Sequence, residues 1–139
     1  MDREVVAEKL ESLRRCVQRV LEKRPPTAEV LLEDFDLQDI LVLNLSRAVQ
    51  LCVDIAAHII ADLEIPPPET MGHAFDALAN AGVLEGTLAT RLKKAVGFRN
   101  IAIHNYEIID WKIVHSIAQN HLTDFSDFAN IVGTRLEGE

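Results

Sequence analysis

The sequence contains few cysteines, glycines and prolines, and these scarcities exclude several classes of protein. Its two cysteines, Cys16 and Cys52, fall within helical patterns and lack the spacing of a metal site. We therefore expect both to be reduced, buried, small apolar residues. With 6 Gly, 5 Pro and 48% apolar residues, the composition is far from that of a disordered chain. The 139 residues suit one domain over residues 1–139 and are too few for two.

Targeting and membrane signals are also missing from the sequence. The N-terminus begins Met1-Asp2-Arg3-Glu4 and leads into a charged amphipathic segment, which is unlike a signal peptide. No apolar run approaches the ~20 residues that a membrane span needs. The sequence therefore predicts a cytoplasmic protein that does not contact a membrane.

Apolar residues recur every three or four positions along almost the whole chain, and no alternating strand pattern competes with them. This periodicity predicts an all-α bundle of about five helices, without internal repeats or a flexible linker. The expected helices lie at about residues 3–23, 34–63, 69–79, 85–103 and 111–132.

The helix expected over residues 34–63 is long for a chain of this size. At 1.5 Å per residue it would extend roughly 45 Å, which exceeds the core of one small domain. Its surplus apolar face is a candidate for packing between subunits. A long helix surrounded by shorter helices of the same chain is the alternative.

Charge is distributed unevenly along the chain. The formal net charge of −8 argues against a general nucleic-acid-binding protein, whose surface is normally basic. Between Gly86 and Tyr106, however, no acidic residue occurs. Three cations of this segment, Arg91, Lys93 and Lys94, are candidates for contact with the phosphates of a nucleic acid. For Lys93 and Lys94 the alternative is that they complement the dipole of their helix and solubilise its outer face.

The most informative stretch is Arg99–Tyr106, with the sequence RNIAIHNY. It sets a fixed cation, an amide, an imidazole and a phenol close together in a strongly helical sequence. Arginine stays charged at physiological pH and presents a planar fork to phosphate, whereas histidine titrates near neutrality and can transfer a proton. Phosphodiester chemistry needs these groups, so this stretch is the candidate catalytic site.

Helical geometry constrains how Arg99 and His104 could act together. Five residues at 100° each place their side chains about 140° apart around a straight helix, so they cannot share one face unless the backbone changes. Gly97 or the helix end near Asn105 could supply that change. The other solution is two-fold symmetry, in which this helix from each of two subunits meets at a shared cleft.

Arg99 also continues the apolar stripe of its helix, so we expect its side chain to point inward or into an interface. An inward arginine needs a buried partner or a ligand. The structural alternative places Arg99 in a buried ion pair, His104 in a hydrogen bond at the helix end and Tyr106 as a packed amphipathic aromatic residue.

A second group of polar side chains occurs on the long helix. Asp54, His58 and Asp62 fall at positions i, i+4 and i+8, but ligands spread over two turns cannot easily close on one metal ion. We therefore expect no metal site and consider Asp54 and His58 as candidate cleft residues, with plain hydrogen bonding between helices as the alternative. His121, on the apolar stripe of the last helix, is expected to be a satisfied core or interface histidine.

Over residues 3–136 the chain resembles the HEPN family (higher eukaryotes and prokaryotes nucleotide-binding), in particular the small toxins that pair with a minimal nucleotidyltransferase (MNT) antitoxin. The family signature is an arginine, four to six residues and then a histidine, commonly with a polar residue after the arginine. The toxin branch adds a tyrosine two residues after the histidine. Residues 75–78 and 82–84 also resemble this branch. The matching motif residues are Arg99, Asn100, His104 and Tyr106.

The resemblance implies a homodimeric, metal-independent RNA endonuclease that needs no cofactor and has its site in the cleft between subunits. His104 would assist attack by a ribose 2′-hydroxyl on the neighbouring phosphate, leaving a 2′,3′-cyclic phosphate and a 5′-hydroxyl. Arg99 would stabilise the extra negative charge of the transition state, and Asn100 would position the phosphate or Arg99. Tyr106 would accept AMP from the antitoxin, and the added charge and bulk would exclude RNA.

A non-catalytic subunit that presents nucleotide or substrate to a nucleotidyltransferase is the competing hypothesis. The same arginine and histidine could hold phosphate without cleaving any bond. The presence of all three motif side chains, Arg99, His104 and Tyr106, favours the nuclease.

Overall fold

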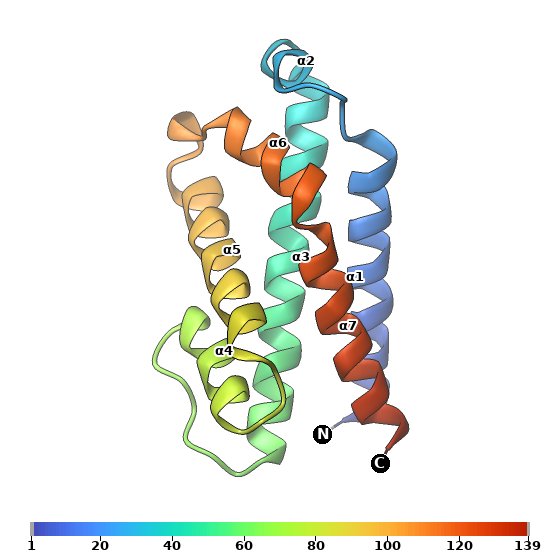
Figure 1. Cartoon of the computed structure of the whole chain (residues 1–139), viewed down its shortest axis with the longest axis vertical. Helices are drawn as coiled ribbons and strands as arrows, with labels where there is room; N and C mark the ends of the chain where they lie inside the picture. Colours follow the sequence, from blue (N-terminus) through green and yellow to red (C-terminus); the bar gives the residue numbers. More distant parts are fainter. Residues whose placement is uncertain (1, 139) are drawn as a thin grey trace.

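The computed structural model describes residues 2–138, which form helices joined by short connections, with no strand in that range (Figure 1). The all-α bundle expected from the periodicity is therefore confirmed. The elements are α1 (Arg3–Lys23), α2 (Ala28–Glu33), α3 (Phe35–Asp62), α4 (Met71–Asn80), α5 (Gly86–His104), the 3₁₀ helix η1 (Tyr106–Ile108), α6 (Trp111–Asn120) and α7 (Leu122–Glu137).

Short polar side chains and one glycine set where several helices begin and end. Asp2 accepts a hydrogen bond from the backbone N–H of Val5 at 3.2 Å, and Asp34 accepts one from the N–H of Leu37 at 3.0 Å, which caps α1 and α3. Gly82 has a φ of +78°, a left-handed conformation that follows α4 at little steric cost. The ends of α1 and α3 agree with the sequence expectation to within about one residue.

Helix α3 forms the centre of the bundle. In Figure 1 it runs the length of the molecule, with α1 on one side and α4 and α5 on the other. It contacts every other α-helix of the described chain. The alternative considered for this helix, a long core helix surrounded by shorter ones, is therefore confirmed.

Part of α3 still presents apolar surface. By length and composition alone it could cross a membrane, contrary to the expectation that no apolar run approaches that size. Half of its most apolar 18-residue window is buried inside the bundle, as a core helix requires. Phe35 and Leu43 nevertheless remain 74% and 56% exposed.

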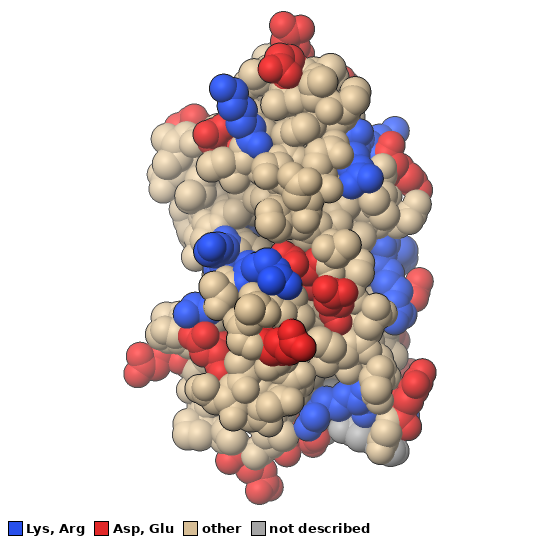
Figure 2. All heavy atoms as spheres, in the orientation of Figure 1, with Lys and Arg blue, Asp and Glu red and all other residues tan. Residues whose placement is uncertain are grey.

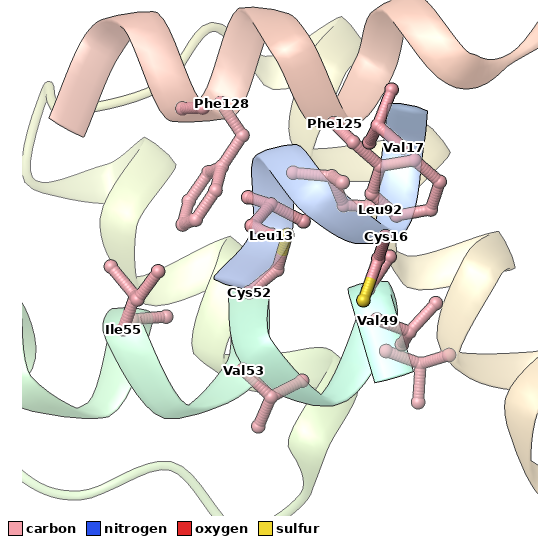
Figure 3. Close-up of a cluster of buried hydrophobic side chains, with 14 of the residues drawn as sticks. Leu13, Cys16, Val17, Val49, Cys52, Val53, Ile55, Leu92, Phe125 and Phe128 are labelled. Atoms are coloured by element: carbon pink, nitrogen blue, oxygen red, sulfur yellow. The ribbon is translucent and has the colours of Figure 1, made fainter. Parts of the chain in front are cut away.

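The core lies where α1, α3, α5 and α7 meet (Figure 3). Phe75 of α4 packs edge to face against Phe128 of α7, with 6.0 Å between ring centroids. Cys16 and Cys52 are free and buried in the same cluster, and burial raises the pKa of each thiol. The expectation for the two cysteines is confirmed.

The C-terminal region differs from the single helix expected over residues 111–132. It forms two helices, α6 and α7, separated at His121 (φ −122°, ψ 7°). The break lets α6 contact α2 while α7 packs along α1. His121 is exposed, and its Nδ1 lies 3.4 Å from Oδ2 of Asp124, so a core position is wrong for it. The interface position that the sequence also allowed stays a prediction. The sequence does not predict α2 either, because six residues carry too little periodic signal.

Candidate active site

The backbone does not bring Arg99 and His104 onto one face. Helix α5 is unbroken from Gly86 to His104, so the two side chains leave it about 140° apart. The helix ends immediately after His104, at Asn105 (φ −142°, ψ 55°), where the sequence predicts its end. Within one chain the two motif residues therefore lie on different faces.

Arg99 is half-buried and lies against α4. Its Nη1 is 3.7 Å from Sδ of Met71 and donates a hydrogen bond to Oδ1 of Asn100 at 3.3 Å. Its Nε is buried and has no hydrogen-bond acceptor among residues 2–138. No ion pair in that range holds the guanidinium, so the buried ion pair considered as an alternative is not found. A partly buried cation with an unused donor is suited to receive an anion.

Asn100 and His104 share an exposed face of α5, because they are four residues apart. Through its contact with Arg99, Asn100 links this face to the guanidinium. The imidazole of His104 makes no hydrogen bond within residues 2–138 and is open to an incoming group.

Tyr106 follows the end of α5 in η1, and its hydroxyl is directed toward α3. The hydroxyl donates a hydrogen bond to Oδ1 of Asp39 at 3.1 Å, and the ring meets Trp111 edge to face at 5.9 Å. Partial burial, then the hydrogen bond to Asp39 and the charge of that carboxylate, raise the pKa of Tyr106. With 41% of the residue exposed, the phenol is held in place yet reachable from outside.

Arg99 and Tyr106 line the same groove, which lies between α3 and α5 and has a volume of 550 Å³. The α3 side of this groove contributes Asp39, Ser46 and Arg47. The Oγ of Ser46 is buried without a hydrogen-bond partner in the described chain. The sequence candidates do not include these three residues. Their signal is polar side chains at helical spacing on the long helix.

Two of the three candidate RNA-binding residues pair with acids from other helices. Nε of Arg91 lies 2.8 Å from Oδ1 of Asp124, and Nζ of Lys93 lies 2.9 Å from Oδ2 of Asp76. Figure 2 shows Lys and Arg side chains directly beside Asp and Glu side chains over α5 and α7. Lys94 is exposed and has no ion pair among residues 2–138. The basic segment is therefore partly neutralised by its neighbours.

A second hollow, of 610 Å³, lies on another face of α5, toward α6 and α7. Arg91 and Lys94 line it together with aliphatic side chains such as Ile101 and Ile113. The structure thus separates these two cations from Arg99.

Asp54 makes contacts between helices. Its Oδ2 lies 3.5 Å from Nζ of Lys9 in α1, and its Oδ1 accepts a hydrogen bond from Nε2 of Gln50 at 2.8 Å. Gln50 lines the groove, so Asp54 is connected to the groove through that residue, whereas half-buried His58 does not line it. Across residues 2–138, no group of three or more His, Cys, Asp or Glu side chains is placed to hold a metal ion.

Comparison with known proteins assigns the chain to a family. The chain matches the family described as "Ribonuclease HepT-like" over residues 5–132. It is also 33% identical over 129 residues to the mRNA nuclease HepT of Shewanella oneidensis, with 93% of this chain and 96% of that protein covered. The chain belongs to the HepT-like ribonuclease family.

Solved structures agree with the HepT-like assignment. A toxin–antitoxin structure with AMP-PNP matches with a TM-score of 0.88 at 32% identity, covering 94% of this chain and 98% of that one. A tri-AMPylated S. oneidensis HEPN toxin in complex with MNT antitoxin matches with a TM-score of 0.87 at 33% identity, covering 96% and 98%. The cytosolic protein YutE of Bacillus subtilis, 16% identical with a TM-score of 0.86 over 99% and 92%, shares the fold alone.

The resemblance to the HEPN family is therefore confirmed. In this HepT-like chain the motif covers the end of α5 and the start of η1. Two of its residues, Arg99 and Tyr106, line the groove against α3.

Proposed function

We propose that this chain is the toxin of a HEPN/MNT toxin–antitoxin pair, an RNA endonuclease that uses Arg99 and His104 and is neutralised by AMP transfer to Tyr106. The observation that supports this proposal most is the state of the Arg99 guanidinium. It has a buried N–H donor without an acceptor and no carboxylate partner among residues 2–138. The relatives support the proposal, since one is named an mRNA nuclease and another is an AMPylated toxin in complex with MNT antitoxin.

The active form in this proposal is a two-fold homodimer. Because Arg99 and His104 of one chain leave α5 on different faces, a phosphate bound by Arg99 of one subunit meets His104 of the other. Leu43 and Ile103 line the groove beside Arg99 and are 56% and 51% exposed, which supplies apolar surface for subunit packing. Helix α3 then serves both as the core of one chain and as part of the subunit interface.

In this cleft the ribose 2′-hydroxyl of the RNA is the nucleophile. His104 accepts its proton as the 2′-oxygen attacks phosphorus, and the bond to the 5′-oxygen breaks. Arg99 stabilises the additional negative charge on the phosphate, and Asn100 holds the guanidinium through their 3.3 Å hydrogen bond. Solvent supplies the proton that the leaving 5′-oxygen takes up, so each site needs one Arg99 and one His104. Side chains, the RNA itself and water supply every group in this step, so it requires no metal ion.

RNA reaches the cleft over the outer surface of α5. Lys94 is the cation best placed to contact phosphate, because it has no ion pair within residues 2–138. Arg91 and Lys93 contribute less, since each must first exchange a carboxylate for a phosphate. Asp54 acts on the groove by holding Gln50 rather than by contacting RNA.

AMP transfer to Tyr106 closes the same groove. The added phosphate and nucleoside would lie beside Arg99, since both side chains line the groove. The modification therefore occupies the cation that the reaction needs and repels the RNA backbone.

Cleavage of total cellular RNA by the purified protein, with and without EDTA, tests this function. Arg99→Ala and His104→Ala should each lower the rate by about 100-fold or more. The matched controls are Arg19→Ala, an exposed arginine paired with Glu22, and His73→Ala, an exposed histidine of α4.

We expect wild type and both controls to cut RNA in EDTA. If wild type binds RNA or nucleotide without cutting, the non-catalytic subunit hypothesis replaces the nuclease. If EDTA abolishes cleavage, the reaction depends on a metal ion.

A further inference from the structure

The hydrogen bond between Tyr106 and Asp39 joins two elements that are 67 residues apart in sequence. The phenol oxygen is held by the carboxylate from α3, while the edge contact with Trp111 holds the ring. Both Asp39 and Tyr106 are exposed residues, so the pair lies at the surface of the chain, where a partner enzyme can approach it. An exposed phenol fixed by two contacts is positioned for a reaction at its oxygen.

A phenol attacks phosphorus efficiently only if its proton is already lost or passes to a base during the attack. The pKa of Tyr106 is raised by partial burial and by Asp39, so tyrosinate is scarce near neutral pH. The attack therefore needs a proton acceptor in contact with the phenol oxygen. The acceptor that the structure provides at that atom is Oδ1 of Asp39, at 3.1 Å.

We propose that Asp39 is the proton acceptor for AMP transfer to Tyr106, an inference that rests on the proposed function. The phenol oxygen attacks the α-phosphorus of ATP held by the nucleotidyltransferase. A new O–P bond forms, the bond from this phosphorus to the pyrophosphate oxygen breaks, and pyrophosphate leaves with the electron pair. The phenolic proton passes along the existing hydrogen bond to Asp39 and then to solvent. The toxin thus supplies a catalytic residue for its own inactivation.

The surroundings of this pair also suit the product. After transfer, the new phosphodiester carries a negative charge next to Asp39, which repels it. Arg47 and Arg99 line the same groove and offer a cationic position for that phosphate. The modified side chain is therefore drawn from Asp39 toward the arginine that the nuclease requires.

Asp39→Asn separates proton acceptance from hydrogen bonding. The amide keeps an oxygen that accepts the hydrogen bond from Tyr106, but it cannot take up the proton. Asp36→Asn is the matched control, because Asp36 is an exposed acid of α3 three residues earlier that makes no hydrogen bond to Tyr106 in the described chain. Its replacement removes the same charge from the same helix.

Two measurements are made on the full-length chain. The first is the rate of AMP addition, followed by intact mass with the cognate nucleotidyltransferase, ATP and magnesium. The second is the absorbance titration of tyrosinate, which reports on Tyr106 alone because the chain has a single tyrosine. The titration shows whether the contact between Asp39 and Tyr106 exists in solution, and the transfer rate shows whether that contact drives AMP addition.

We expect Asp39→Asn to lower the transfer rate by about 100-fold and Asp36→Asn to leave it within about 2-fold of wild type. Asp39→Asn should also lower the pKa of Tyr106, because the carboxylate that raises it is gone. Its transfer rate should then recover as the pH rises from about 7 to about 9, since tyrosinate needs no proton acceptor. A residue that only shapes the fold would not produce this recovery.

The outcomes distinguish this inference from the proposed function. If the wild-type chain gains no AMP, the proposed function fails whatever Asp39 does. If wild type is modified and Asp39→Asn is modified equally fast, the role of Asp39 is overturned. An unchanged tyrosinate titration in Asp39→Asn overturns it as well, because the contact would be absent in solution.

Discussion

Arg99 and His104 belong to one sequence motif, yet they leave an unbroken helix in directions about 140° apart. A single chain therefore presents the two side chains on different faces of α5. In the homodimer that we propose, the second copy presents the face that the first copy lacks. The half-buried guanidinium of Arg99 and the exposed imidazole of His104 would then belong to one shared site.

Because Arg99 has no ion pair in the described chain, we expect that removing its side chain costs little folding stability. Arg99→Ala should lower the free energy of unfolding by less than about 1 kcal/mol, because no carboxylate is left unpaired. Arg91→Ala is the informative comparison, since it leaves the largely buried Asp124 without its 2.8 Å partner and should cost about 1–3 kcal/mol. Urea unfolding measures both values. A loss of about 3 kcal/mol or more for Arg99→Ala would show that Arg99 has a structural partner.

The two neighbouring lysines of α5 should contribute unequally to RNA binding. Lys94→Ala should weaken binding and lower the slope of log affinity against log salt by about 1, because a free cation releases counterions from phosphate. Lys93→Ala should have a smaller effect, since Asp76 already lies 2.9 Å from its ammonium group. Salt titrations with His104→Ala as the background prevent cleavage during the measurement. Equal slopes for both variants would mean that the ion pair does not persist in solution.

Tyr106→Phe should separate modification from catalysis. Phenylalanine keeps the ring that contacts Trp111 and loses only the hydroxyl bonded to Asp39, so the fold should be retained. AMP transfer should stop, because its acceptor oxygen is gone, while RNA cleavage continues. Intact mass and RNA cleavage measure the two activities. Neutralisation of this variant with mass added at another residue would refute the switch, and a folded but inactive variant would place Tyr106 in the catalytic step.

The raised pKa of Tyr106 gives a specific dependence of stability on alkaline pH. The folded chain holds the phenolic proton more tightly than the unfolded chain, whose tyrosine has a pKa of about 10. This contribution to stability is therefore complete below about pH 10 and is lost as the pH rises through the folded pKa. Urea unfolding between about pH 9 and about pH 11 should show a steeper loss for wild type than for Tyr106→Phe.

Both proteins in that comparison share the contribution of Cys16 and Cys52, whose pKa values are also raised by burial. The difference between the two curves therefore isolates the phenol. Parallel curves would show that the environment of Tyr106 does not favour its protonated form.

Long periodic segments made most of the fold predictable from sequence. The stripes of α1 and α3 are regular over many turns, and polar caps such as Asp34 mark their starts. Two features could not be predicted from the sequence. Helix α2 has only six residues, which is too short for an apolar periodicity to show. The apolar stripe continues across His121, although the backbone breaks there. The break is set by the packing of α6 and α7 on different helices.

The candidate site was only half predictable for a similar reason. Arg99, His104 and Tyr106 are adjacent in sequence and belong to a recognisable motif. Asp39 and Arg47 reach the same groove from a helix about 60 residues earlier, and a single sequence gives no pairing between such distant segments. Asp39 is recognised as a site residue only in the folded structure, where its carboxylate accepts a hydrogen bond from the hydroxyl of Tyr106.

Mixing two inactive variants tests the shared site most directly. Arg99→Ala and His104→Ala chains, carrying different tags, are co-expressed, and dimers that contain one of each are isolated by both tags. A mixed dimer retains one intact pair, with Arg99 from one subunit and His104 from the other. We predict that RNA cleavage, absent from either variant alone, returns in the mixed dimer. Mixed dimers that form and remain inactive would contradict the account, because Arg99 and His104 would then have to act within one chain.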